Sequence, residues 1–98
     1  MVIYKGVNFY PRQIESLLLG TPGLGPEYQI VLDSDGGGER LTIVAEAEAG
    51  VGREAATRLG RGLHDLLALS PVIQLCPPGT IERAPGKAVR VVDRRARA

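Results

Sequence analysis

Two lysines mark the places in this sequence where side chains could do chemistry. The chain contains ten arginines but only two lysines, Lys5 and Lys87, and each lysine is next to a glycine, Gly6 or Gly86. A lysine ammonium is a compact charge on a flexible stem, which suits a point contact with a phosphate or carboxylate oxygen. The segment 77–88 around Lys87 contains too many prolines and glycines for a regular helix or a central strand. Lys87 is therefore a candidate anion-contacting residue in a loop, and a solvated surface lysine is the alternative.

Other kinds of site are disfavoured. A single cysteine, Cys76, excludes an internal disulfide and a cysteine-based metal site, and it fits the reducing cytoplasm in which we expect the protein. The run Asp33–Gly38 lacks the lysine-serine pair of a phosphate loop and the glutamate of a calcium loop. We therefore expect no metal site and interpret this run as a flexible hairpin loop.

Charge and hydropathy limit the partners. The net charge of +1 gives no reason to expect nucleic acid. The basic cluster lies in the tail 94–98, which we expect to be a frayed, solvated end. No apolar run approaches the roughly 18 residues that span a bilayer, and the N-terminus lacks a signal-peptide core, so we expect no membrane partner.

One domain with two helices is predicted to position the lysines. Ninety-eight residues with 44% apolar content can build one modest core, so we assign residues 1–98 to a single domain. The segment 11–19 starts at a proline, carries apolar residues at helical spacing and ends before Gly20, which predicts a short helix. The segment 53–69 predicts a longer helix, and its apolar stripe consists of Ala56, Leu59, Leu63, Leu66 and Leu67.

The strands predict the fold class. Apolar and β-branched runs at 28–32, 41–47 and 72–76 predict strands, and shorter β-prone runs lie at 1–4 and 89–92. The resulting order is β-α-β-β-α-β, followed by the Pro/Gly loop and a last short strand. This order predicts an α+β, ferredoxin-like fold, in which two helices cover one face of an antiparallel sheet.

Two long segments resemble one protein family. The segment Tyr4–Glu15, YKGVNFYPRQIE, is similar to the R-G-V-N-V-F-P-S-Q-I-E segment of phenylacetate–coenzyme A ligases. The segment Pro78–Asp93, PGTIERAPGKAVRVVD, is similar to their terminal P-G-S-I-P-R-S-E-G-K-A-x-R-V-x-D. Between them, Gly25–Gln29 resembles the family's G-P-H-Y-Q. The resemblance covers essentially the whole chain and is to the small C-terminal lid domain of these adenylate-forming, acyl-activating ligases.

The resemblance implies a role for each lysine. Such ligases convert a carboxylic acid and ATP to an acyl-adenylate and then transfer the acyl group to coenzyme A, and the lid takes a different orientation for each step. By this resemblance Lys87, next to Gly86, supplies the adenylation lysine that reaches the substrate carboxylate and the α-phosphate. The coenzyme A side of the lid would be the loop of Lys5, Gly6, Val7 and Asn8.

The resemblance also implies what the chain needs. Its partner would be a large N-terminal adenylation domain, in cis or in trans, which would bind Mg²⁺. ATP and coenzyme A would be substrates of the complete enzyme, so we expect the isolated chain to be inactive and to hold no cofactor. Ala84-Pro85 stands where the family has Ser-Glu, and Lys5 replaces the usual arginine. The alternative is a stand-alone module of ferredoxin-like fold that binds a small molecule or dimerises. The dimer in that case would be a homodimer.

Overall fold

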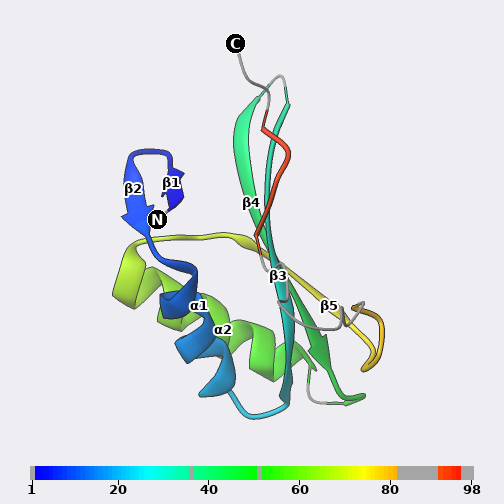
Figure 1. The fold of residues 1–98 in the computed structure, drawn as a ribbon. Coiled ribbons are helices and arrows are strands. Elements are labelled where there is room, and N and C mark those ends of the chain that lie inside the picture. The colour runs from blue at the N-terminus through cyan, green and yellow to red at the C-terminus, as the bar shows by residue number, and fades with distance from the viewer. Residues whose placement is uncertain (1, 36, 51, 82–90, 96–98) are drawn as a thin grey trace.

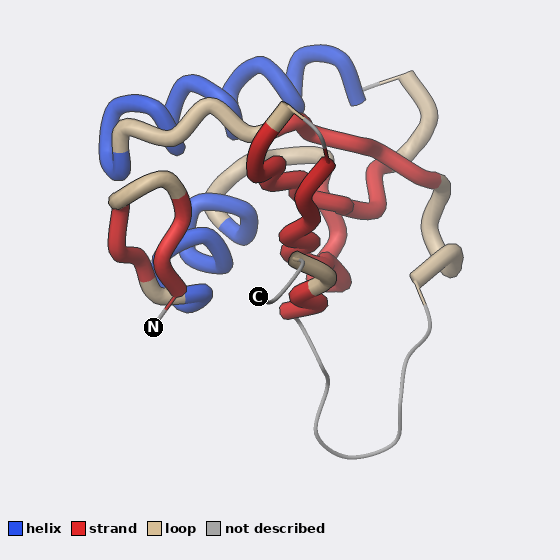
Figure 2. The backbone as a smooth tube through the Cα atoms, turned by 90° about the horizontal axis from the view of Figure 1, so that it is seen from above, coloured by secondary structure: helices blue, strands red, loops and turns tan. Residues whose placement is uncertain are grey.

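The N-terminal residues form a hairpin of their own. The computed structural model describes residues 2–35, 37–50, 52–81 and 91–95. Strand β1 (Val2–Tyr4) pairs antiparallel with β2 (Val7–Phe9) in a two-stranded sheet, with Tyr4 opposite Val7. This register leaves a two-residue turn between the strands. Figure 2 shows the hairpin beside the helices of the domain.

The main sheet has four strands in the order β5-β4-β3-β6. Its centre is a long antiparallel pair formed by β3 (Leu24–Asp35) and β4 (Gly38–Ala47). The two outer strands, β5 (Val72–Cys76) and β6 (Val91–Asp93), run parallel to their neighbours β4 and β3. The sheet is therefore mixed.

Two helices lie on the same side of this sheet (Figure 1). Helix α1 (Pro11–Leu19) begins at a proline, and the Gln13 side chain accepts a hydrogen bond from the Tyr10 N–H at 2.8 Å. Helix α2 (Gly52–Leu67) buries Ala55, Leu59 and Leu63, which repeat every four residues. The side chain of Tyr28 links the layers, because its hydroxyl donates to Glu15 Oε2 of α1 at 2.7 Å.

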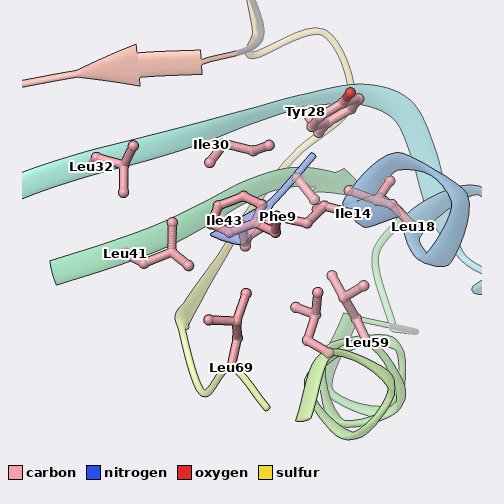
Figure 3. Close-up of a cluster of buried hydrophobic side chains, with 12 residues drawn as sticks. Phe9, Ile14, Leu18, Tyr28, Ile30, Leu32, Leu41, Ile43, Leu59 and Leu69 are labelled. Atoms are coloured by element: carbon pink, nitrogen blue, oxygen red, sulfur yellow. The ribbon is translucent and has the colours of Figure 1, made fainter. Parts of the chain in front are cut away.

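The hydrophobic core fills the space between helices and sheet (Figure 3). The sheet contributes alternate residues that face the helices, as expected for strands with one covered face. The buried members from β3 and β4 are Tyr28, Ile30, Leu32, Leu41, Ile43 and Ala45. They pack with Phe9 of the hairpin, Ile14 and Leu18 of α1, and Leu59 and Leu63 of α2. The hairpin is thus anchored to the domain through the Phe9 end of β2.

The α+β class with two helices on one face is confirmed, but the expectation of a wholly antiparallel sheet is wrong. Helix α2 carries the chain back along β4 over about 24 Å, at about 1.5 Å per residue. Strand β5 therefore starts at the same end as β4 and runs parallel to it, with Thr42 opposite Val72. The N-terminal strand also does not join the sheet, because its two-residue turn pairs it with β2.

Three local expectations are corrected. The strands β3 and β4 extend into the predicted loop of 33–38, because the ladder continues to the pair Asp35–Gly38. Helix α2 ends at Leu67 rather than at residue 69, and Ala68 follows with a φ of 55°. Leu66 is 59% exposed, so it lies outside the buried stripe to which the sequence assigned it.

Candidate functional site

The turn of the N-terminal hairpin has an unusual backbone. Lys5 and Gly6 both have positive φ, 48° and 79° respectively. Two positive φ values in a two-residue hairpin loop define a type I′ turn, whose twist matches that of the flanking strands. Glycine suits this conformation without cost, whereas a lysine in the left-handed region is uncommon. The chain therefore reverses direction at Lys5, the first central residue of the turn, and Gly6, the second.

The turn presents an open surface. Lys5, Gly6 and Asn8 are exposed, and a Cβ added to Gly6 would meet no atom within 4 Å. The ammonium of Lys5 lies 5.5 Å from the centre of the Tyr4 ring, a cation–π distance. Val7 differs from the other three predicted site residues, because it is half-buried and packs against the core. The exposed face of the turn is therefore mainly backbone and the Lys5 side chain.

Polar contacts from distant segments hold the turn. The Lys5 N–H donates to Glu39 Oε2 at 3.3 Å, and the Tyr4 hydroxyl donates to the Glu39 carbonyl at 3.4 Å. Arg95 Nη1 donates to the Ile3 carbonyl at 2.6 Å and lies 3.6 Å from Glu39 Oε2. Glu39 and Arg95, which are far apart in the sequence, therefore meet at the hairpin.

The segment that carries Lys87 leaves the sheet from a defined position. Residues 77–80 form a turn in which the Thr80 N–H donates to the Pro77 carbonyl at 3.2 Å and Gly79 has a φ of 88°. Pro78 followed by a glycine of positive φ is the pattern of a type II turn. Next, the buried Ile81 donates its N–H to Glu46 Oε2 at 2.8 Å.

The same segment returns to the sheet at β6. The Arg94 N–H donates to the Leu32 carbonyl at 2.6 Å, which extends the contact of β6 with β3. Arg95 Nε and Nη2 donate to the two carboxylate oxygens of Asp93 at 3.0 and 2.8 Å. The hydrogen bond with Asp93 raises the pKa of Arg95 above its ordinary value, so the guanidinium stays charged. Lys87 and Gly86 themselves lie outside the described residues.

Three of these residues could not have been found from the sequence alone. Glu46 reads as an outward-facing residue of an alternating strand, yet it is only 2% exposed because the chain around Ile81 covers it. Arg94 and Arg95 belong to the basic tail that the sequence predicts to be frayed, and for these two residues the expectation is wrong. The Arg95–Ile3 contact joins residues 92 positions apart, and no local pattern predicts such a pair.

The comparisons with known proteins agree on one family. The family model of the AMP-binding enzyme C-terminal domain matches residues 6–95. A phenylacetate–coenzyme A ligase of Aromatoleum evansii is 42% identical over 104 residues, which cover 97% of this chain and 24% of that protein. A crystallised domain of a phenylacetate–coenzyme A ligase from Bacteroides vulgatus ATCC 8482 has a TM-score of 0.82 at 35% identity, over 98% of this chain and 93% of that one. The chain belongs to the C-terminal domain family of AMP-binding enzymes, as found in phenylacetate–coenzyme A ligases.

A further solved structure is relevant to the site. A 2-hydroxyisobutyryl-CoA ligase in complex with 2-HIB-AMP and CoA, in its thioesterification state, has a TM-score of 0.82 at 27% identity. The alignment covers 97% of this chain and 21% of that enzyme. The chain therefore spans about a quarter or less of the length of the ligases that it matches.

Two further features of the domain bear on other kinds of function. Among the described residues, no helix is long and apolar enough to cross a membrane. Within the same part of the chain, no three metal-ligating side chains of the His, Cys, Asp or Glu type gather into a cluster.

Proposed function

We propose that this domain is the lid of an ATP-dependent acid–coenzyme A ligase and supplies different residues to its two half-reactions. The observation that carries the proposal is the extent of the family match. The match begins at Gly6 in the hairpin turn and continues past Lys87 to Arg95. Both candidate segments therefore belong to one family domain, whose relatives include acid–coenzyme A ligases.

Lys87 serves the first half-reaction. A carboxylate oxygen of the acid attacks the α-phosphorus of ATP, a bond to that phosphorus forms, and pyrophosphate leaves with the electrons of the broken bond. Negative charge crowds around the phosphorus in this step, and a positioned ammonium stabilises it. The two ends of the Lys87 segment support this role. Ile81 is held by the buried Glu46, and β6 is paired with β3.

The hairpin turn serves the second half-reaction. The thiol of coenzyme A loses its proton and attacks the acyl carbon, and AMP leaves. The exposed Lys5-Gly6 turn has no side chain above Gly6, so a narrow pantetheine arm can approach the backbone closely. The Lys5 ammonium adds a positive charge at the same place, which suits the phosphates of coenzyme A.

Lys87→Ala tests the first assignment in the complete enzyme, with the large adenylation domain supplied by fusion or in trans. Acyl-adenylate formation, measured by pyrophosphate release, should slow on the order of 10²–10³-fold, the usual loss for one preorganised charge-stabilising donor. Thioester formation from supplied acyl-adenylate should change little, because this step does not use Lys87. An equal loss in both half-reactions, or in neither, would contradict the assignment.

A stand-alone binding module remains the competing function, and the isolated chain separates the two. One lysine and a few backbone amides contribute roughly 1.5–3 kcal/mol for a charged contact, less than the roughly 4 kcal/mol of millimolar binding. Calorimetry of the isolated chain with ATP, AMP or coenzyme A should therefore detect no saturable site. A micromolar dissociation constant for any of them would favour the binding module.

A further inference from the structure

The hairpin is held to the domain at both of its ends, by different kinds of contact. At the Phe9 end the anchor is apolar, since Phe9 is fully buried in the core. At the turn end the central residues Lys5 and Gly6 are exposed, so burial cannot fix their position. An isolated two-stranded hairpin is marginally stable in water. Tyr4 and Val7, on either side of the turn, pack against the core, and the two exposed central residues are held in addition by the polar contacts that reach the turn.

Arg95 provides the contacts that link the turn to the far end of the chain. Its Nε and Nη2 donate hydrogen bonds to the Asp93 carboxylate, and its Nη1 donates to the Ile3 carbonyl at 2.6 Å. The same Nη1 lies 3.6 Å from Glu39 Oε2, the oxygen that accepts the Lys5 N–H. The rigid, planar fork of an arginine can make these contacts together, whereas the single ammonium of a lysine cannot.

The geometry places the anchor on the strand that follows the Lys87 segment. Asp93 is the last residue of β6, and β6 pairs with the central strand β3. In Figure 1 the hairpin and the C-terminal end of β6 lie toward the same end of the molecule. The Arg95 side chain is 23% exposed, so its contacts are partly shielded from competing water. The position of the turn is thus set by contacts with the main sheet.

We propose that Arg95 is a positioning residue for the coenzyme A half-reaction. By holding Ile3 and Glu39 it orients the Lys5-Gly6 turn relative to the main sheet, without touching the substrate itself. The proposal rests on the function assigned above to the turn. Its structural part, that Arg95 restrains the hairpin, can be tested on the 98-residue chain without any assumption about activity.

Amide hydrogen exchange of the chain tests the restraint. Arg95→Ala should accelerate exchange in residues 2–9 by about tenfold or more, because a hydrogen bond from a charged group is lost. Exchange at Ile30 and Ile43, in the centre of the sheet, should change much less. Arg58→Ala is the matched control, since Arg58 pairs with Glu54 on the exposed face of α2. Unchanged exchange in residues 2–9, or equal acceleration at Ile30 and Ile43, overturns the proposal.

Kinetics of the complete enzyme test the consequence. Arg95→Ala should slow thioester formation from supplied acyl-adenylate by about tenfold and leave adenylate formation within about twofold, whereas Arg58→Ala should leave both steps intact. Equal losses in both steps, or an intact second step, overturn the proposal. Gly6→Leu separates this failure from failure of the proposed function. If Gly6→Leu slows the second step and Arg95→Ala does not, only the role of Arg95 is wrong, whereas an intact second step in both variants rejects the role of the turn as well.

Discussion

At the scale of single residues, Glu46 shows how a buried side chain can define where a loop begins. The carboxylate is 2% exposed and accepts the N–H of Ile81, which is itself buried. A buried backbone N–H without an acceptor is costly, so this bond fixes the chain at the point where it leaves the sheet. Lys87 lies six residues after Ile81 in the sequence. We expect the Glu46–Ile81 bond to stabilise the base of that segment.

Replacement of Glu46 by leucine should lower the free energy of unfolding by about 1–3 kcal/mol, because the Ile81 N–H loses its acceptor inside the protein. Glu46→Gln keeps an oxygen in nearly the same place and should cost less. Urea unfolding of the isolated chain, monitored by circular dichroism, measures both changes. If the two variants lost the same stability, the hydrogen bond would not be what makes Glu46 important.

Some residues of the site were predictable from the sequence and others were not, for a physical reason. Lys5 and Gly6 were identified because a rare residue type next to a glycine is visible locally. The positive φ of Lys5 was not, because lysine has no preference for the left-handed region. Glu39 and Arg95 gained their roles from contacts over 34 and 92 positions, which depend on how the strands pair.

At the scale of elements, the end of α2 carries a small strain. Ala68 has a φ of 55°, and its N–H donates to the His64 carbonyl at 2.9 Å, as in a left-handed helix cap. Glycine usually occupies this position, because a Cβ in the left-handed region costs about 1–2 kcal/mol. Ala68 is exposed, so its methyl group buries little apolar surface in return.

Ala68→Gly should therefore raise the free energy of unfolding by about 0.5–1 kcal/mol, after part of the gain is offset by the greater freedom of glycine in the unfolded chain. Ala56→Gly inside α2 is the control, and it should lower stability by about 1 kcal/mol. Thermal or urea unfolding of the two variants measures the opposite signs. A destabilised Ala68→Gly variant would show that the left-handed cap is not strained.

Helix bounds were easier to predict than strand directions. The short helix was predicted at 11–19 and is observed there, because Pro11 and Gly20 mark its two ends. The strand 72–76 was also predicted with its observed bounds. A period-two pattern carries no information about direction, so the parallel pairing of β5 with β4 could not be predicted from it. The predicted apolar stripe of the long helix was less accurate, because it included Leu66, which faces solvent.

At the scale of the whole molecule, the hairpin turn is linked to the end of the strand that follows the Lys87 segment. The hairpin turn and the β6 end of the Lys87 segment are joined through Arg95, Asp93 and Glu39. A domain of this kind can present one segment or the other to a larger partner by changing its orientation as a rigid body. The proposed division of labour between Lys87 and the turn requires this arrangement.

The most direct test of that division is the effect of Gly6→Leu on the two half-reactions of the complete enzyme. We expect thioester formation from supplied acyl-adenylate to fall by roughly tenfold or more, because the leucine side chain would obstruct the approach of coenzyme A. Adenylate formation should remain close to that of the unmodified enzyme. A Cβ at position 6 would meet no atom within 4 Å, so the cost to folding is expected from the positive backbone φ and is checked by unfolding the isolated variant. If adenylate formation slowed as much as thioester formation, or if thioester formation stayed intact, the turn would not have the role proposed for it.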